Sequence, residues 1–352
     1  MAAVVAGTAG GLDEFFAATR AAFEDAARRL GRIERRYRLG PGVLRLSVAG
    51  AAMADAIAGA LTHLRLPDDD GTASLTIRAW DGAGSGRPMV PAPWPATAYG
   101  QKGEIDVGGD GRYAGFFQQG AETLSLFDRP AAEAFYWARD AAAMPYWERS
   151  FPFRPIYHWA MAGTTLQPVH AGAVGRVHGG VLITGRSGAG KTTTTISCLE
   201  GGLAYAGDDY VLVDCGPAPT VYSLYDTAKF TEDSLARFPR FADAVWNRTR
   251  TGDDKALLYG HRAFPQALVA AMPIRAIVVP RVTGLPHTEL RPIPVTAAIR
   301  ALAPTTLAQL PGHGAETMAK LTRLCAAVPC LEVAAGTELA GIARALAAWL
   351  DR

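Results

Sequence analysis

The chain has 352 residues and is 49% hydrophobic, so it is long enough for two domains with separate cores, and its composition argues against disorder on a large scale. The 35 basic and 33 acidic residues leave a net charge of only +2. This balance excludes a strong field that would attract nucleic acid or an anionic membrane. No run of about 18 apolar residues occurs, which argues against a membrane span. We therefore expect neither partner.

The cysteines and the N-terminus bear on the compartment. Four cysteines without CxxC spacing indicate a reducing compartment and no zinc site. The first residues, MAAVVAGTAGG, lack the basic segment of a signal peptide, and a cytoplasmic protein is expected. The densest basic cluster, Arg32, Arg35, Arg36 and Arg38, contains Glu34 and is interpreted as a solvated face. The sequence leaves the oligomeric state open, with a homo-oligomer as one alternative.

The N-terminal part is predicted to be a small mixed α/β domain. Apolar residues recur at helical spacing over 12–30 and then alternate with polar residues, as expected of half-buried strands. The predicted elements are helices over 12–30, 53–64 and 130–142, strands over 44–48 and 75–79, and a hairpin of 113–118 with 122–127. Residues 81–103 are rich in Pro and Gly and are predicted to be a long loop. We place the domain boundary near residue 160, which gives domains 1–160 and 161–352.

The C-terminal part is predicted to be an α/β domain built around a phosphate-binding loop. The predicted strands are 168–174, 180–184, 220–225, 274–280 with 289–293 beside it, and 330–333, and the predicted helices are 191–199, 233–238 and 339–350. The stretch GRSGAGKT, residues 185–192, fits the phosphate-loop pattern between a strand and a helix. A chance Gly-rich turn is the alternative.

The phosphate-loop pattern has a chemical reason at each position. Glycines let consecutive N–H groups approach a polyphosphate, and the following helix adds the partial positive charge of its N-terminus. Lys191 supplies a mobile cation to the β and γ phosphates, and the Thr192 hydroxyl is a ligand for Mg²⁺. The predicted nucleotide-binding residues are Gly185, Arg186, Ser187, Gly188, Ala189, Gly190, Lys191, Thr192 and Thr193.

Two adjacent acids, Asp208 and Asp209, follow one helix after the loop and precede an apolar run. One carboxylate can hold Mg²⁺ and its neighbour can take the proton of an attacking hydroxyl, although such a pair can also be a simple turn. Neighbours along a strand point to opposite faces, so both acids can serve one site only if the chain turns there, which Gly207 permits. His170 lies in a predicted strand before the loop, where a single histidine is most often structural.

Lysine is rare in this chain, because 30 of the 35 basic residues are Arg. Where Arg is the usual cation, a Lys can mark the need for a compact charge that follows a transferred phosphoryl group. Lys229 and Lys255 are therefore secondary candidates for the site, and exposed loop lysines are the alternative interpretation.

These residues together resemble a known family. His170, the loop from Gly185 to Thr192 and the segment Ala206 to Val211 (AGDDYV) are similar to the catalytic domain of the bacterial HPr kinase/phosphorylase family, over roughly residues 165–215. That resemblance implies a P-loop fold shared with phosphoenolpyruvate carboxykinase, and a phosphotransferase that uses ATP and Mg²⁺. It implies that Lys191 binds phosphate, that Asp208 is the general base, that Thr192 and Asp209 bind Mg²⁺, and that His170 orients or polarises the acceptor. The roles of the two acids remain exchangeable.

The departures from the family concern the acceptor. Ala171 follows His170 where the family has Gly, and the C-terminal signature associated with HPr recognition is not visible between Ala297 and Arg352. The layout is more similar to HPr-kinase-like enzymes of peptide-modification clusters, such as the tailoring kinases of lasso peptides, which phosphorylate a serine. We therefore expect a peptide or protein serine as acceptor, with residues 1–160 as a candidate acceptor-binding domain.

Three other functions remain open at this stage. One is a small-molecule kinase with the same site, and another is a nucleotide-binding regulatory protein without turnover. A carboxykinase reaction ranks last, because the chain shows no second cluster of metal ligands.

Overall fold

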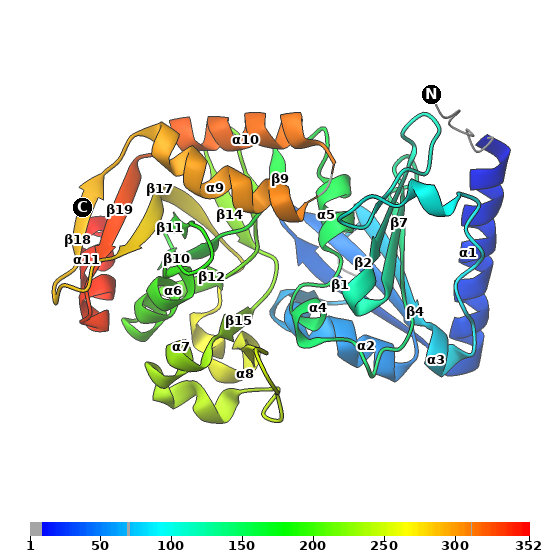
Figure 1. Ribbon diagram of the computed structural model, residues 1–352, viewed down its shortest axis with the longest axis horizontal. Coiled ribbons are helices and arrows are strands. Elements are labelled where there is room, and N and C mark those ends of the chain that lie inside the picture. Colours follow the sequence, from blue (N-terminus) through cyan, green and yellow to red (C-terminus); the bar gives the residue numbers. More distant parts are fainter. Residues whose placement is uncertain (1–8, 69–70, 311) are drawn as a thin grey trace. The chain divides into compact units, whose positions relative to one another are not determined.

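The computed structural model describes residues 9–68, 71–310 and 312–352. The chain divides into two compact units, the first formed within Met1–Gly59 and Arg65–Ala160 and the second from Ala60–Leu64 and Met161–Arg352 (Figure 1). None of the helices in the described ranges is both long and apolar enough to cross a membrane.

The first unit contains an eight-stranded mixed sheet in the order β3-β1-β2-β4-β8-β7-β6-β5. Its strands are β1 (Arg32–Leu39), β2 (Gly42–Ala49), β3 (Arg65–Leu66), β4 (Leu75–Asp81), β5 (Glu104–Ile105), β6 (Tyr113–Gln118), β7 (Thr123–Asp128) and β8 (Glu133–Ala138). Its helices are α1 (Ala9–Leu30), α2 (Ala51–Ala58), α3 (Gly82–Ser85), α4 (Tyr146–Ser150) and α5 (Arg154–Ala160). The predicted N-terminal helix is confirmed: α1 buries Leu12, Phe15 and Phe23 in one core with Trp80 of β4.

The predicted helix over 130–142 is wrong. The segment forms β8, which pairs with β4 in parallel and with β7 in antiparallel orientation. Phe135 packs against Phe16 on one face, whereas the next residue, Tyr136, packs edge to face on Phe153. Aromatic residues favour strands, and a strand buried on both faces shows no alternation of apolar and polar residues. The periodicity therefore did not distinguish this strand from a helix.

The second unit is built on a nine-stranded mixed sheet. Seven strands follow the order β12-β10-β11-β17-β14-β13-β9, and β17 also pairs with β19, which pairs with β18. The strands are β9 (Leu166–Val169), β10 (Gly172–Arg176), β11 (Gly179–Ile183), β12 (Ala204–Gly207), β13 (Val211–Asp214), β14 (Thr220–Ser223), β17 (Ala271–Val282), β18 (Glu289–Pro292) and β19 (Cys330–Ala335). A separate two-stranded ribbon contains β15 (Thr227–Phe230) and β16 (Ala256–Tyr259).

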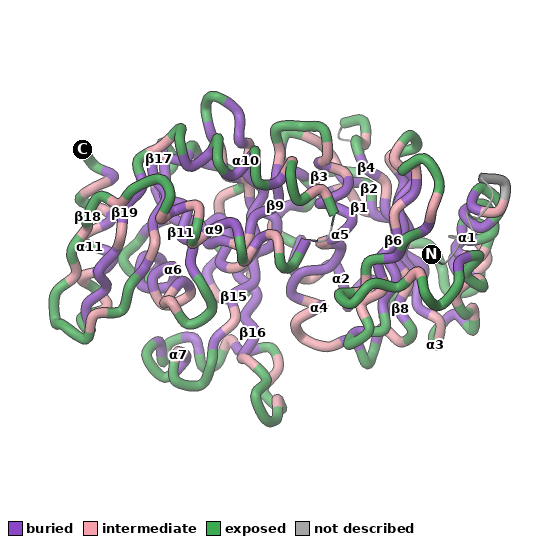
Figure 2. The backbone as a smooth tube through the Cα atoms, turned by 45° about the horizontal axis from the view of Figure 1, so that its top comes forward, coloured by how far each residue is buried: buried purple, intermediate pink, exposed green. Residues whose placement is uncertain are grey.

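Helices cover both faces of the sheet in the second unit (Figure 1). They are α6 (Lys191–Glu200), α7 (Glu232–Ala236), α8 (Gly260–Ala263), α9 (Val295–Gln309), α10 (Gly314–Ala327) and α11 (Leu339–Leu350). Successive residues of β11 point to opposite faces: Val181 and Ile183 join the core that contains α6 and α11, and Leu182 joins the core that contains α9 and α10. The central strand β11 is accordingly buried along its length (Figure 2). Short 3₁₀ helices are η1 (Gly59–Leu64), η2 (Ala96–Ala98), η3 (Gln119–Ala121), η4 (Pro239–Ala244) and η5 (Pro265–Ala267).

Two strand predictions in this unit need correction. The predicted strand 168–174 is two strands, because a tight turn with a 3.0 Å bond from the Ala171 N–H to the Val169 carbonyl separates β9 from β10. His170 lies in that turn and not within a strand. The segment 289–293 was expected beside 274–280, but β18 pairs with β19. The predicted helix 339–350 is confirmed as α11.

The β10–β11 hairpin depends on two facing glycines. Gly175 pairs with Gly180, and a Cβ on Gly175 would lie 2.2 Å from the Gly180 Cα. Because backbone blocks that position, we expect Gly175→Ala to reduce the free energy of unfolding by about 1–3 kcal/mol. Urea unfolding followed by circular dichroism measures this loss. Gly314→Ala is the matched control, since among the described residues its Cβ would meet Leu307 alone, at 3.9 Å. Equal stability of the two variants would contradict the prediction.

Candidate functional site

The sheet topology brings three separate segments to one edge. β10 runs antiparallel to β11 with Gly172 opposite Ile183, and β12 runs antiparallel to β10 with Gly207 opposite Ala173. The start of β10 therefore lies beside the end of β11 and the end of β12. These three ends carry, respectively, His170, the phosphate loop and the two acids.

The phosphate loop connects β11 to α6. Gly188 and Gly190 have φ values of 80° and 95°, a region that glycine adopts without steric cost. Lys191 begins α6 and is only 7% exposed, and its Nζ donates to the carbonyl oxygens of Gly185 at 2.8 Å and Arg186 at 3.4 Å. Burial lowers the pKa of Lys191, although Asp209 and Asp208 act in the opposite direction. The ammonium thus lies inside the curve of the loop, where a phosphate would bind.

Asp208 joins the site through the first turn of α6. The Thr192 hydroxyl donates to Asp208 Oδ2 at 2.9 Å, and Asp208 is 1% exposed. Its second oxygen, Oδ1, is buried and has no hydrogen-bond partner among the described residues. Burial raises the pKa of Asp208 to about 7, and the adjacent charge of Asp209 contributes to the same shift.

Asp209 has the opposite electrostatic environment. Its Oδ2 lies 3.2 Å from Lys229 Nζ, and its Oδ1 lies 3.5 Å from His170 Nε2. Burial raises the pKa of this carboxyl, but Lys229 and His170 together outweigh burial and hold the pKa well below its usual range. The two adjacent acids therefore differ in protonation, since one is held ionised and the other titrates near neutral pH.

His170 is held in place by α9 and by Tyr210. Its backbone N–H donates to the Thr306 hydroxyl at 3.2 Å, and its ring centre is 5.2 Å from that of Tyr210. The Tyr210 hydroxyl donates in turn to Gln309 Oε1. The sequence interpretation missed Thr306 and Gln309, because only the packing of α9 on the sheet brings them near His170.

The two secondary lysines take different positions. Lys229 is on β15 and contacts Asp209, as described above. Lys255 immediately precedes β16, and its charge contributes to lowering the pKa of Lys191. Both lysines belong to the ribbon of β15 and β16 or its margin, so the ribbon adds positive charge to the site.

A buried polar cluster holds the start of that ribbon, and the sequence interpretation missed it as well. Asp226 is fully buried, and its Oδ2 lies 2.7 Å from both the backbone N and Nδ1 of His261. His63 lies 4.0 Å from the same oxygen and forms a 2.6 Å bond with Ser223. Burial lowers the pKa of His63 to about 4, so this imidazole is neutral at physiological pH. Asp226 directly precedes β15, so this cluster fixes the start of the strand that carries Lys229.

The residues present fit a magnesium ion that arrives with a nucleotide. No group of three or more His, Cys, Asp or Glu side chains within the described ranges is arranged to hold a metal alone. Mg²⁺ bound with a nucleotide does not need such a group, because it takes one or two protein oxygens together with phosphates and water. The Thr192 hydroxyl and the adjacent carboxylates of Asp208 and Asp209 are hard oxygen donors of the required kind, and Asp208 Oδ1 has no partner among the described residues.

The chain has little detectable similarity to known proteins. No family model and no curated protein matches the chain. Among solved structures, the Hpr(Ser) kinase/phosphatase from Coxiella burnetii matches at 10% identity and a TM-score of 0.28, covering 53% of this chain and 96% of that one. A TM-score of this size does not establish a common fold.

The raised pKa of Asp208 has a consequence for stability. The folded chain keeps this proton up to about pH 7, whereas the unfolded chain releases it near pH 4, so the native state loses stability as pH rises between these values. Between these pH values we expect the free energy of unfolding of wild type to fall relative to that of Asp208→Asn. The slope is at most about 1.4 kcal/mol per pH unit. Thermal unfolding at several pH values measures the difference. Asp253→Asn, in an exposed turn, should parallel wild type; parallel curves for Asp208→Asn would refute the shift.

Proposed function

We propose that this chain is a kinase that uses ATP and Mg²⁺ to transfer the γ-phosphoryl group to a hydroxyl. The observation that carries the proposal is the 2.9 Å contact between Thr192 and Asp208, which sets the acid pair against the first turn of the helix after the phosphate loop. A loop of main-chain amides, a buried ammonium and two carboxylates then share one edge of the sheet. Phosphoryl transfer depends mainly on such positioning and charge neutralisation.

Asp208 suits the role of general base. A carboxyl with a pKa of about 7 can take a proton near neutral pH and is a stronger base than an ordinary aspartate. Its buried Oδ1 has no partner within the described part of the chain and, in this proposal, accepts the proton of an acceptor hydroxyl that enters the site. His170 and Tyr210 border the same acids and would help to orient that acceptor.

Thr192 and Asp209 are proposed to hold the metal. When bound, Mg²⁺ would neutralise charge on the β and γ phosphates. Lys229 and His170 now contact Asp209, and in this proposal Lys229 would turn toward the transferred phosphoryl group once the metal is bound. The contact of Thr192 with Asp208 favours the exchanged assignment, in which Asp208 binds the metal; against it, the low pKa of Asp209 makes that residue the weaker base.

The acceptor is proposed to be a serine of a peptide or protein. The resemblance of the motifs to HPr-kinase-like enzymes supports this class, and the missing HPr-recognition signature directs it toward other peptides, such as a ribosomally made lasso peptide. In this proposal, residues 1–160 bind the acceptor and residues 161–352 carry the catalysis. A small-metabolite acceptor is the alternative that uses the same site.

Transfer of labelled phosphate from ATP to peptide and metabolite pools tests the proposal. We expect Lys191→Ala and Asp208→Asn each to lower the transfer rate about 100-fold or more. The first variant loses the cation that neutralises the phosphates, and the second loses the base that removes the proton of the acceptor. Arg323→Ala, at an exposed position of α10 away from the site residues, should match wild type. Nucleotide-dependent stabilisation without any labelled product would instead indicate a regulatory protein without turnover.

Magnesium titration separates the two assignments of the acids. If Asp209 binds the metal, Asp209→Asn should raise the Mg²⁺ concentration needed for half-maximal transfer, and Asp208→Asn should stay slow at saturating Mg²⁺, because only the base is then missing. The reverse pattern would establish the exchanged assignment.

A further inference from the structure

The sheet edge gives the bound nucleotide a direction. In the strand order β12-β10-β11-β17, the two acids follow β12 on one side of β11, and β17 and β19 lie on its other side. The γ-phosphate must face Asp208 for transfer, so the nucleoside must point away from β12, toward β17 and β19. Ligands of α/β sheets bind outside the carboxyl ends of the strands, and β11, β17 and β19 are parallel, with their carboxyl ends at this edge.

Exposed aliphatic side chains lie along that direction. Val282 ends β17 and Leu285 follows it, and each is 64% exposed. Val282 lies directly beside the phosphate loop, because a Cβ built on Gly190 would be 3.5 Å from Val282 Cγ2. Nucleotide sites combine such apolar contacts with a few polar groups.

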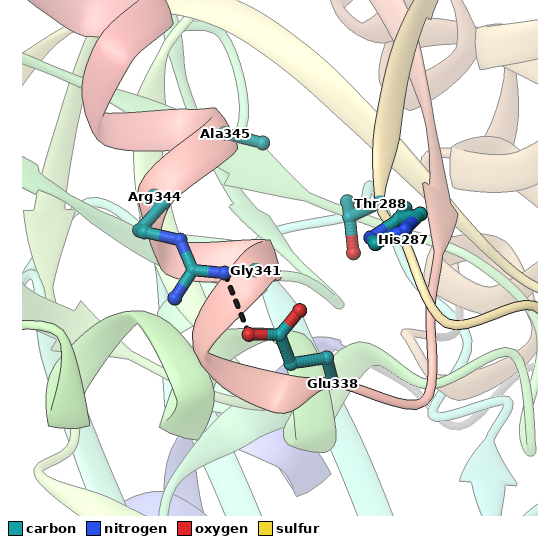
Figure 3. Close-up of a pocket in the computed structure, with 6 residues that line it drawn as sticks. All are labelled: His287, Thr288, Glu338, Gly341, Arg344 and Ala345. Carbon is teal, nitrogen blue, oxygen red and sulfur yellow. Dashed lines mark hydrogen bonds and ion pairs between the residues drawn. The ribbon is translucent and has the colours of Figure 1, made fainter.

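A polar pocket lies at the end of the same path. It has a volume of about 310 Å³ and is lined by His287, Thr288, Glu338, Gly341, Arg344 and Ala345. Glu338 caps the start of α11 and Arg344 projects from a later turn of this helix, and His287 and Thr288 lie opposite them on the segment before β18 (Figure 3). The helix α11 follows β19, which lies two strands, roughly 10 Å, from β11.

The pocket walls are held by hydrogen bonds between two loops. The N–H groups of Thr337 and Glu338 donate to the carbonyl oxygens of Leu285 at 2.8 Å and Pro286 at 3.2 Å. The Gly336 N–H donates to the Thr288 hydroxyl at 3.0 Å. A preformed pocket of this kind binds without a large ordering cost.

The charges of the pocket suit a neutral polar ligand. Arg344 donates to Glu338 at 2.7 Å, so the two charges compensate each other. The Glu338 carboxylate would repel a phosphate but can accept from the hydroxyl groups of a ribose or the amino group of a base. The pocket therefore matches the nucleoside and not the phosphate chain.

We propose that the surface from Val282 and Leu285 to this pocket binds the base and ribose of the nucleotide whose phosphates occupy the loop at residues 185–192. This inference rests on the proposed function, because it requires the γ-phosphate to face Asp208. It adds a nucleoside site on the end of β17, the segment before β18 and α11, which none of the phosphate-loop residues supplies.

Calorimetry with ATP and with inorganic tripolyphosphate tests the nucleoside site. A Cβ on Gly341 would lie 3.6 Å from Thr288 Oγ1 and 3.8 Å from Arg344 Nη2, so a larger side chain there enters the pocket. We expect Gly341→Phe to weaken ATP binding about tenfold or more and to change tripolyphosphate binding less than about twofold. Gly341→Ala fits the space and should bind both ligands as wild type does.

The exposed aliphatic surface has its own matched pair of variants. Leu285→Ser should weaken ATP binding about threefold to tenfold, since it removes apolar contact with the nucleoside. Val177→Ser is the control, because Val177 is 80% exposed in the turn between β10 and β11, at the opposite edge of the sheet. It should leave ATP binding unchanged.

The outcomes separate this inference from the proposed function. Equal binding of ATP and tripolyphosphate by wild type, or a Gly341→Phe variant that binds ATP normally, would overturn the nucleoside site and leave the kinase proposal in place. A Gly341→Phe variant that loses both ligands equally while keeping its melting temperature would also overturn it. Failure of wild type to bind either ligand would instead reject the phosphate loop as a nucleotide site.

Discussion

The site depends on two carboxylates that are adjacent in sequence and largely withdrawn from water. Two neighbouring carboxyl groups cannot both ionise at low cost in a region of reduced dielectric. The chain resolves the conflict asymmetrically, because Lys229 and His170 contact the Asp209 carboxylate directly, whereas the described contact of Asp208 is with the Thr192 hydroxyl. One acid is therefore fixed as an anion, and its neighbour keeps a proton until about neutral pH. Pairs of acids with such separated pKa values occur where catalysis needs two different roles.

The fold creates this asymmetry by placing groups that are distant in sequence at one end of a hairpin. The turn at His170 and the turn after Gly207 meet because β10 pairs on one side with β11 and on the other with β12. Gly172 allows the close approach, since a Cβ there would lie 2.7 Å from Thr195 Oγ1 and 3.0 Å from the Asp208 carbonyl. The geometry of the acids is thus linked to packing between the first strands of the sheet and α6.

The sequence allowed the glycine-rich loop at residues 185–192, its flanking strand and helix, and the amphipathic helices α1 and α11 to be predicted. These features are local, because each is defined by residue spacing over one segment. The errors at β8 and at the turn containing His170 arose where strands are buried on both faces, so that no polar alternation marks their ends. Other features depend on how helices pack against the sheet. These are the contacts of Thr306 and Gln309 and the pocket at the start of α11. Spacing along the chain carries no signal for such contacts.

The cations of the site are already engaged with groups of the protein. Lys191 donates to two carbonyl oxygens of its own loop, and Lys229 and His170 contact Asp209. A polyphosphate entering the loop would exchange the carbonyl contacts of Lys191 for charge-assisted bonds, which are stronger. A divalent cation on the acids would likewise release Lys229 toward the phosphate. In the proposed kinase, metal binding would therefore favour nucleotide binding, because a cation on the acids would free Lys229 for the phosphate.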